Sequence, residues 1–440
     1  MTKKFFNYVI PSVMAMWVFS IYTMVDGIFV GRGVGPTALA AVNISMPFIN
    51  FIFAISLLLT TGTSTLVAIK LGQGDKQEAS KLFSMNIMLL IFISLGIMFL
   101  SLINLDSLAR FLGATDVTIE YVKDYLGIII WFSIFFIVSY SLEVLVKTDG
   151  SPNLATIGVI IAAIINIILD YIFVIKLDYG IKGAAYATGI SQMLSIIIFL
   201  VHFTGKKSTL KFTAFKFNLS IIKRISIIGV PDCITEFSAG IIVFLFNQIL
   251  LSTLGEQGVV TYTVISYVNT IVIMTMIGIC QGMQPLVSFY YGKNDNKSVN
   301  YLFTLSLKTI IFVSIFIFLI SISLAKYIVA AFISPLESTL YLYSVNAFKI
   351  FSISFLILGI NILISSFYVA IEKPKYSMII SLSRGLFVIA ISSVFMTYLF
   401  GDTGTWISSF VSEVICLALS FILIKKYFKS NSIKLKKSQC

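Results

Sequence analysis

The chain has 440 residues, of which 58% are hydrophobic and 11% are charged, with a mean hydropathy of +1.01. A soluble globular protein of this size would have too little polar surface to face water, so the composition excludes that class. The net charge of +12 could suggest a partner such as nucleic acid. The basic residues lie beside apolar runs, however, where they favour a membrane surface instead. We therefore predict an all-α integral membrane protein that binds no nucleic acid.

Apolar runs of about 20 residues recur along the whole chain, and each is long enough to cross the ~30 Å hydrocarbon core of a bilayer as a helix. They predict twelve transmembrane helices, which span residues 6–30, 38–68, 84–104, 121–146, 153–175, 183–202, 225–252, 258–289, 303–325, 342–370, 377–398 and 405–424. The connectors between them are short, so none could hold a soluble catalytic domain. The sequence also contains no HExxH, no GxSxG and no histidine cluster. We therefore predict no enzyme, no catalytic residue and no cofactor.

The first predicted span contains a proline near its start and an acid near its end. Pro11 removes a backbone hydrogen bond and so permits a bend, although a proline in the first turn of a helix is tolerated without one. Asp26 follows in the stretch YTMVDGIFVG. A charge at the centre of a bilayer costs roughly 3 kcal/mol on insertion scales, so an acid within a span is a functional candidate by default.

The fourth predicted span ends in SYSLEVLVKTDG, which places Glu143 four residues before Lys147. Residues four apart lie on one face of a helix, so the two side chains could form an ion pair near the end of the span. Glu143 could equally belong to a polar site or cavity inside the membrane. The sequence leaves both interpretations open.

The fifth predicted span contains IINIILDYIFV, in which Asn166 and Asp170 stand four residues apart on one helical face. Their amide and carboxylate oxygens are hard donors, suited to a small cation such as Na⁺ or to a proton relay. Thr188, in GAAYATGIS on the sixth span, supplies a hydroxyl at a depth similar to that of Asp170. If spans one, five and six converge, Asp26 joins these three side chains in one cation site. The alternative is that the groups form hydrogen bonds between helices and bind nothing.

A repeat at half the chain length divides the protein. The stretches GTSTLVAIKLGQGDKQEASKLF (62–83) and GMQPLVSFYYGKNDNKSVNYLF (282–303) agree at 7 of 22 positions without a gap. Each half then holds six spans and enters the membrane from the same side. The repeat therefore predicts two six-helix bundles related by a pseudo-two-fold axis along the membrane normal, an arrangement used by transporters.

The predicted domains are an N-terminal lobe at 1–205, a cytoplasmic inter-lobe loop at 206–224 and a C-terminal lobe with a basic cytoplasmic tail at 225–440. With both termini placed inside the cell, most of the 31 Lys and Arg residues fall on the cytoplasmic side. That bias is the one expected of multi-pass membrane proteins. We predict a monomer in the cytoplasmic membrane of a bacterium or archaeon.

The second half carries further ionisable residues. Glu236, in PDCITEFSAG on the seventh span, lies about one and a half turns after Pro231 and could face a central cavity. Asp232 directly follows Pro231, so we interpret it as a helix-start acid that the helix dipole favours. Arg384 on span eleven and Glu413 on span twelve could pair with each other.

Four motifs make the chain recognisable as similar to a known family. VDGIFVGRGVG closes span one, GTSTLVAIKLGQGD closes span two, NIILDYIFV lies in span five and GMQPLVSFYYGKND closes span eight. With its twelve spans and duplicated halves, the chain resembles the MATE (multidrug and toxic compound extrusion) family, in particular its prokaryotic DinF-like and MepA-like branches within the MOP superfamily. The resemblance implies a secondary antiporter that exports organic cations or drugs by alternating access, in exchange for Na⁺ or H⁺.

The resemblance also assigns roles to residues. It implies a cation site in the N-terminal half at Asp26, Asn166, Asp170 and Thr188, and a bend of the first helix at Pro11. Two positions depart from the family pattern. Glu143 stands where relatives often have asparagine, and Glu236 does not align with the deeper span-seven acid of other branches, which makes a coupling site in the C-terminal half doubtful.

A lipid-linked oligosaccharide or lipid flippase of the same superfamily is the alternative function. A flippase would favour a strongly cationic cavity that can hold pyrophosphate. The charges within the predicted spans are mostly acidic. That difference favours the antiporter.

Overall fold

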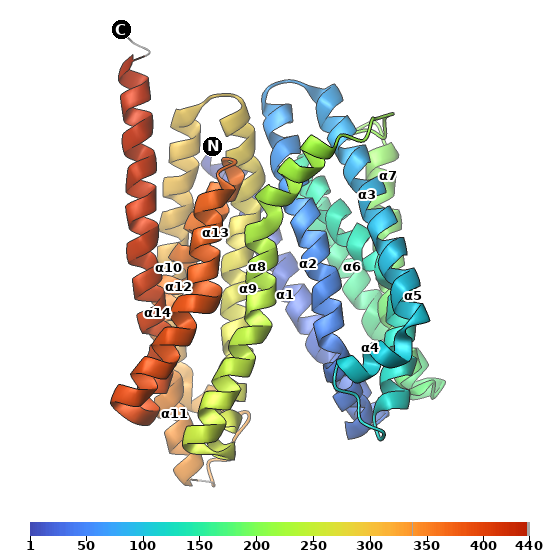
Figure 1. The fold of residues 1–440 in the computed structure, drawn as a ribbon, viewed down its shortest axis with the longest axis vertical. Coiled ribbons are helices and arrows are strands. Elements are labelled where there is room, and N and C mark those ends of the chain that lie inside the picture. Colours follow the sequence, from blue (N-terminus) through green and yellow to red (C-terminus); the bar gives the residue numbers. More distant parts are fainter. Residues whose placement is uncertain (337, 438–440) are drawn as a thin grey trace. The chain divides into compact units, whose positions relative to one another are not determined.

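The computed structural model describes residues 1–336 and 338–437, without the side chains of residue 338 and of residues 427–437, so most of the predicted basic tail lies outside the described side chains. Almost all of the described chain is helical, and the α-helices can be followed by their labels and colours in Figure 1. The elements in chain order are α1 (Thr2–Gly33), α2 (Pro36–Gly72), α3 (Lys76–Ile103), α4 (Leu105–Phe111), α5 (Ile119–Thr148), α6 (Pro152–Asp170), η1 (Tyr171–Lys176), α7 (Gly180–Thr204), α8 (Leu219–Leu254), α9 (Glu256–Gly292), α10 (Asn296–Ala330), α11 (Ser338–Ser352), α12 (Phe355–Ala370), α13 (Pro374–Leu382), η2 (Ser383–Phe387) and α14 (Val388–Lys437).

Eleven continuous helical segments of the described chain are long and apolar enough to cross a membrane, and the last of them, Pro374–Lys426, contains two spans. Gly401 interrupts α14 with a φ of 57° and a ψ of −137°, a left-handed conformation that glycine adopts without strain. The chain reverses there, because Thr397 bonds Thr405 across 2.8 Å and Ser393 bonds Ser408 across 3.3 Å. The prediction of twelve transmembrane helices in an all-α membrane protein is therefore confirmed.

Packing divides the chain into two compact units. The first comprises Met1–Cys233 and Gln281–Val299, and the second comprises Ile234–Cys280 and Asn300–Cys440. The start of α8 and the end of α9 thus belong to the first unit. The predicted lobe boundaries at 1–205, 206–224 and 225–440 stay a prediction.

The repeated motif explains why the end of α9 joins the first unit. A Cβ atom on Gly72 of α2 would overlap the carbonyl oxygen of Phe289 on α9, and a Cβ on Gly292 of α9 would overlap that of Ile69 on α2. The two glycines are equivalent in the repeat, so each allows its helix to approach the other's backbone. The contact is reciprocal, as expected for pseudo-two-fold symmetry.

The repeat also preserves two helix caps. Asp75 Oδ1 accepts the backbone N–H of Glu78 at 3.0 Å at the start of α3, and Asp295 Oδ1 accepts that of Ser298 at 3.0 Å at the start of α10. A side-chain oxygen at this position satisfies one of the amide donors that a helix N-terminus leaves without an internal partner. The equivalent aspartates therefore end equivalent loops.

Within the first unit, α5 packs against α2, α3 and α7, while α6 packs against α1 and α7. Within the second, α12 packs against α13 and α14, and η2 packs against α13 and α14. Each unit also contains a short π-helical segment inside a span, η1 directly after Asp170 and η2 around Arg384. Such segments are uncommon in proteins, and those that do occur are often at functional sites.

Candidate functional site

The first unit brings two acidic side chains together inside the membrane. Asp26 lies on α1 and is 8% exposed, and Asp170 ends α6 and is fully buried. Because α1 and α6 pack along each other, the two carboxyl groups interact and can share a hydrogen bond when one of them is protonated. The sequence analysis left open whether these two residues converge, and the structure brings them together.

Four oxygens at this site have no hydrogen-bond donor. Among the described residues, none donates to Oδ1 or Oδ2 of Asp170, to Oδ1 of Asp26 or to Oδ1 of Asn166, all of which are buried. A buried acceptor without a donor costs about 1–3 kcal/mol. Carboxylate and amide oxygens are the donors that a hard cation prefers, and a carboxylate pair can also bind a proton. The residues present therefore fit Na⁺ or H⁺.

Thr188 orients Asn166 through its hydroxyl group, and its own place among the ligands of the site stays a prediction. The Asn166 Nδ2 donates to Thr188 Oγ1 at 3.3 Å, and Thr188 Oγ1 donates to the carbonyl oxygen of Ala184 at 3.0 Å. The Thr188 hydroxyl thus donates its proton within α7, and a lone pair on its oxygen accepts the hydrogen bond from Asn166. This arrangement leaves the amide oxygen of Asn166 without a partner, as a ligand requires.

Two tyrosines that sequence reasoning missed belong to the surroundings of the acid pair. Tyr125 of α5 is 2% exposed and interacts electrostatically with Asp26, Asp170 and Tyr22. Tyr22 lies four residues before Asp26, and its spacing on one helical face could have indicated it. No sequence signal pointed to Tyr125, because only the packing of α5 places it there.

Glu143 forms the ion pair that its spacing suggested. Lys147 Nζ lies 2.7 Å from Glu143 Oε1 and 3.3 Å from Oε1 of Gln281, and both charged side chains are nearly buried. Tyr22 interacts electrostatically with Glu143 as well as with Asp26, so the pair lies beside the acid site. A direct role of Glu143 in coupling stays a prediction.

The structure corrects two interpretations of helix starts. Pro11 stands inside α1, which begins at Thr2, so it is not a first-turn proline. Asp232 is not a helix-start acid, because α8 begins at Leu219 and continues through Pro231. Sequence reasoning placed the helix start too late because the polar residues before the span continue the helix beyond the apolar core.

Pro11 is connected to the helix that carries the second acid. Thr156 Oγ1 of α6 donates to the carbonyl oxygen of Pro11 at 2.7 Å. A change in the conformation of α1 at Pro11 would therefore act on α6 through this hydrogen bond. The predicted bend at this position stays a prediction.

The second unit contains a buried charge network of a different kind. Arg384 Nε donates to Glu413 Oε1 at 2.8 Å, and Asn361 Nδ2 donates to Glu413 Oε2 at 2.7 Å. Ser420 Oγ in turn donates to Asn361 Oδ1 at 3.1 Å. The pairing of Arg384 with Glu413 that the sequence allowed is present, whereas the part played by Asn361 was missed. Glu236 is half-buried on α8 in this unit, and its predicted role stays a prediction.

Comparison with known proteins identifies relatives along the whole length. The model of the MatE family matches residues 11–172 and 233–396. The chain is 24% identical over 427 residues to the multidrug export protein MepA of Staphylococcus haemolyticus, covering 96% of this chain and 93% of that protein. It is 22% identical over 425 residues, with the same coverage, to MepA of Staphylococcus aureus strain MRSA252.

Solved structures share the fold. An outward-facing multidrug resistance MATE family transporter of the MOP superfamily matches with a TM-score of 0.92 at 21% identity, over 97% of this chain and 96% of that one. A MOP superfamily transporter from Pyrococcus furiosus, described as having a binding pocket of reverse polarity, matches with a TM-score of 0.90 at 22% identity, over the same shares. These likenesses confirm the predicted fold of twelve membrane-spanning helices.

Proposed function

The chain belongs to the MatE family, and we propose that it is a secondary active antiporter that exports organic cations and drugs in exchange for Na⁺ or H⁺. The MepA proteins that it resembles are multidrug export proteins. The observation that carries the ion coupling is the buried carboxyl pair of Asp26 and Asp170, which contributes three of the four oxygens that no described residue supplies with a donor. As a transporter, the chain would need no catalytic residue.

The acid site would bind the coupling ion with its own side chains. A bound Na⁺ would take the oxygens of Asp26, Asp170 and Asn166, while Thr188 holds Asn166 in position. A bound proton would reside on one carboxyl group and be donated to the other. Burial disfavours two ionised carboxylates, so either ion stabilises the closed arrangement of α1 against α6.

Exchange requires that the ion and the drug favour different states of the transporter. Export of an organic cation is coupled to ion uptake only if the organic cation binds more strongly to the state that binds the ion more weakly. Because α1 carries both Pro11 and Asp26, a bend at Pro11 would alter the position of Asp26 relative to Asp170. The bond from Thr156 to Pro11 would link that bend to α6.

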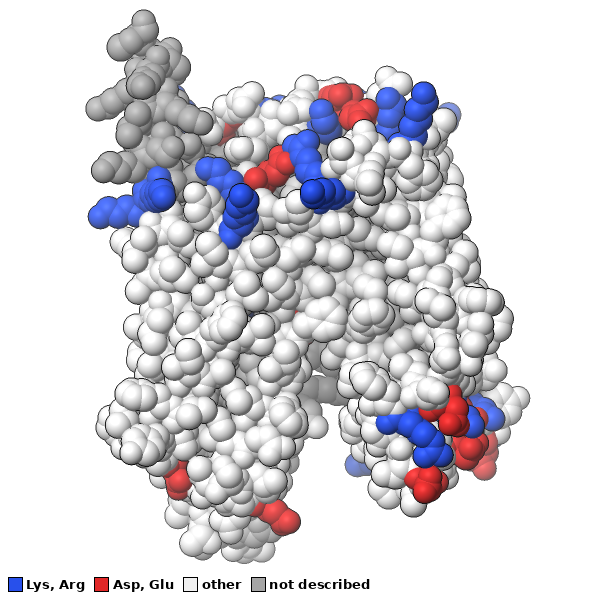
Figure 2. Space-filling model, in the orientation of Figure 1, with Lys and Arg blue, Asp and Glu red and all other residues white. Residues whose placement is uncertain are grey.

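The charges at the two ends of the first unit support a cytoplasmic location of the N-terminus. On the face shown in Figure 2, blue Lys and Arg side chains gather at the end that carries the α7–α8 connector, and a mixed group of acids and bases occupies the other end. At that other end Arg110, Lys123 and Lys182 each pair with an aspartate or glutamate. The unbalanced positive charge therefore lies on the side of the connector, which the positive-inside rule assigns to the cytoplasm.

The flippase alternative gains no support from the buried cations. Lys147 pairs with Glu143, and Arg384 pairs with Glu413. Neither positive charge is thus available for a pyrophosphate group without breaking an ion pair.

Transport by purified protein in liposomes tests the proposal. The liposomes are loaded with a fluorescent organic cation, a Na⁺ gradient and a pH gradient are imposed separately, and wild type is compared with Asp170→Asn. We expect wild-type dye flux under one of the gradients and none in the variant. Equal flux in both proteins would refute the acid site, and no flux of the cation under either gradient would favour the flippase.

A further inference from the structure

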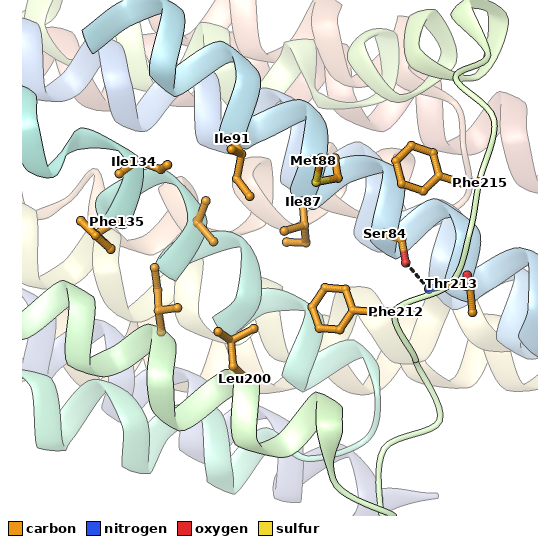
Figure 3. A pocket seen from close by; sticks show the side chains of 12 residues that line it. Ser84, Ile87, Met88, Ile91, Ile134, Phe135, Leu200, Phe212, Thr213 and Phe215 are labelled. Carbon is orange, nitrogen blue, oxygen red and sulfur yellow. Dashed lines mark hydrogen bonds between the residues drawn. The ribbon is translucent and has the colours of Figure 1, made fainter.

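A cavity on the first unit lies apart from the acid site. It has a volume of about 560 Å³ and lies between α3, α5, α7 and the connector between α7 and α8 (Figure 3). Apart from Ser84 and Thr213, its lining side chains are apolar, and Ile87, Ile91, Leu200 and Phe212 are among those drawn in Figure 3. None of the four residues of the proposed coupling site lines it, so it is not part of that site.

The cavity opens where a membrane protein meets lipid. Met88 on α3 and Phe212 on the connector line it and are themselves exposed, and Ser84 to Ile91 extend over about two turns of α3. In a membrane-spanning helix this exposed apolar surface faces hydrocarbon chains. The shape therefore suits a flexible apolar chain that enters from the bilayer.

The connector is fixed over one end of the cavity by partly buried hydrogen bonds. The Asp149 carboxylate accepts the backbone N–H groups of Thr209 at 3.0 Å and Leu210 at 3.1 Å, and pairs with Nε2 of His202 at 2.8 Å. Ser84 Oγ accepts the backbone N–H of Thr213 at 2.9 Å, as the dashed line in Figure 3 shows. The cavity is therefore preformed and its wall does not depend on a ligand.

The same connector is basic. Residues 203–220 contain four lysines and no acidic residue, and Lys206, Lys207 and Lys216 are exposed. Lys216 directly follows Phe215, which lines the cavity. Basic groups at the end of an apolar groove between membrane helices are the pattern that recognises an anionic lipid headgroup. They would repel the organic cations that the transporter exports, so the groove does not suit the exported substrate.

We propose that this cavity binds an anionic phospholipid of the leaflet that faces the connector. One acyl chain occupies the apolar space between α3, α5 and α7, Lys216 beside the lining residue Phe215 binds the phosphate, and Lys206 and Lys207 add to the positive charge of the connector. A phospholipid held in this way fastens the connector, which joins the two repeats, to the first unit. The site does not depend on the proposed antiport, since its ligand is a membrane lipid.

Thermal unfolding of the purified full-length chain in detergent tests the headgroup part. Phosphatidylglycerol is added at increasing concentration and compared with phosphatidylcholine of identical acyl chains and with inorganic phosphate. We expect phosphatidylglycerol alone to raise the Tm, by several degrees. The variant Lys206→Gln/Lys207→Gln/Lys216→Gln should lose that rise, whereas Lys297→Gln/Lys308→Gln/Lys375→Gln, with the same change in charge on exposed lysines elsewhere, should keep it.

A matched pair of substitutions tests the acyl-chain part. Ile196 lines the cavity, whereas its neighbour Ile197 on α7 is exposed and does not line it. In native mass spectrometry we expect Ile196→Trp to retain at least tenfold less phosphatidylglycerol than wild type, and Ile197→Trp to retain as much as wild type. Equal retention by both variants, an equal rise of Tm with phosphatidylcholine or phosphate, or loss of the rise in the control lysine variant would each overturn the proposal.

Discussion

Two buried carboxylates show how differently the two units treat an acid inside a span. Glu413 receives a hydrogen bond on each oxygen, from Arg384 at 2.8 Å and from Asn361 at 2.7 Å. Asp170 receives none on either oxygen from any described residue, and it interacts instead with a second acid, Asp26. The second unit supplies the positive charge that its acid needs, and the first unit leaves that charge to be supplied from outside.

Burial alone therefore does not identify a functional acid. Both carboxylates are nearly inaccessible, and both interrupt an apolar sequence. A buried acid whose oxygens are fully hydrogen-bonded within the protein is a structural element, because removing one partner leaves an uncompensated charge. A buried acid without hydrogen-bond donors is stable only when a bound cation or a proton neutralises its charge.

The largest expected effect is on transport by variants of the first unit. We expect Asp26→Asn and Asp170→Asn each to reduce cation-driven dye efflux from proteoliposomes to background. Neither should lower the Tm, because each removes a buried charge without breaking a hydrogen bond that holds the fold. A variant that unfolds at lower temperature and still transports would show that its acid stabilises the fold and does not bind the coupling ion.

Variants of the charge network in the second unit should lose stability rather than transport. Glu413→Gln leaves Arg384 without its counter-ion and should lower the free energy of unfolding by about 3–5 kcal/mol. Adding Arg384→Met should restore much of that loss, since the unpaired charge is then removed. Both quantities follow from thermal or denaturant unfolding of the purified chain. Per folded molecule, the two variants should keep ion-coupled efflux, and complete loss of coupling in stable protein would place Glu413 in the ion pathway.

An intermediate effect is expected for the residue that orients Asn166. Thr188→Val removes the hydroxyl that accepts from Asn166 Nδ2, so the affinity for the coupling ion should fall about tenfold, the scale seen when a residue that positions a ligand is lost. Ser191→Ala is the matched control, because its hydroxyl donates only to the carbonyl of Thr188 within α7. The concentration of Na⁺, or the pH, that gives half-maximal efflux measures the change. Equal shifts in the two variants would show that Thr188 acts through helix stability.

The smallest effect distinguishes the equivalent caps of the two halves. The Ser298 hydroxyl, which donates to Asp295 at 2.6 Å, and the Ser298 backbone N–H hold the pKa of Asp295 below its usual value. Its folded-state pKa is lowered, so its stabilisation is present above the usual carboxyl pKa and is lost as the pH falls through the lowered one. At neutral pH Asp295→Ala should cost about 1 kcal/mol of unfolding free energy. Asp75→Ala should cost less, because Asp75 lacks the second bond, and unfolding curves of both variants at neutral and acidic pH measure the difference.

Much of the fold followed from local sequence. Long apolar runs determine the spans, because no other secondary structure satisfies a single segment's backbone in lipid. The repeat at an offset of 220 residues anticipated that Gly72 and Gly292 would occupy equivalent places, although not that they would contact each other's helices. Within the site, the four-residue spacing of Asn166 and Asp170 and that of Glu143 and Lys147 correctly placed each pair on one face, because helical geometry is local.

Other features were decided only by tertiary structure. Nothing in the order of residues shows that α1 packs on α6 to bring Asp26 to Asp170, that α5 places Tyr125 beside them, or that Asn361 completes the bonding of Glu413. The sequence determined that acids would lie within the membrane. Which acid has a partner depends on side chains that are tens to hundreds of residues apart in the chain, and only the packing of helices sets the distances between them.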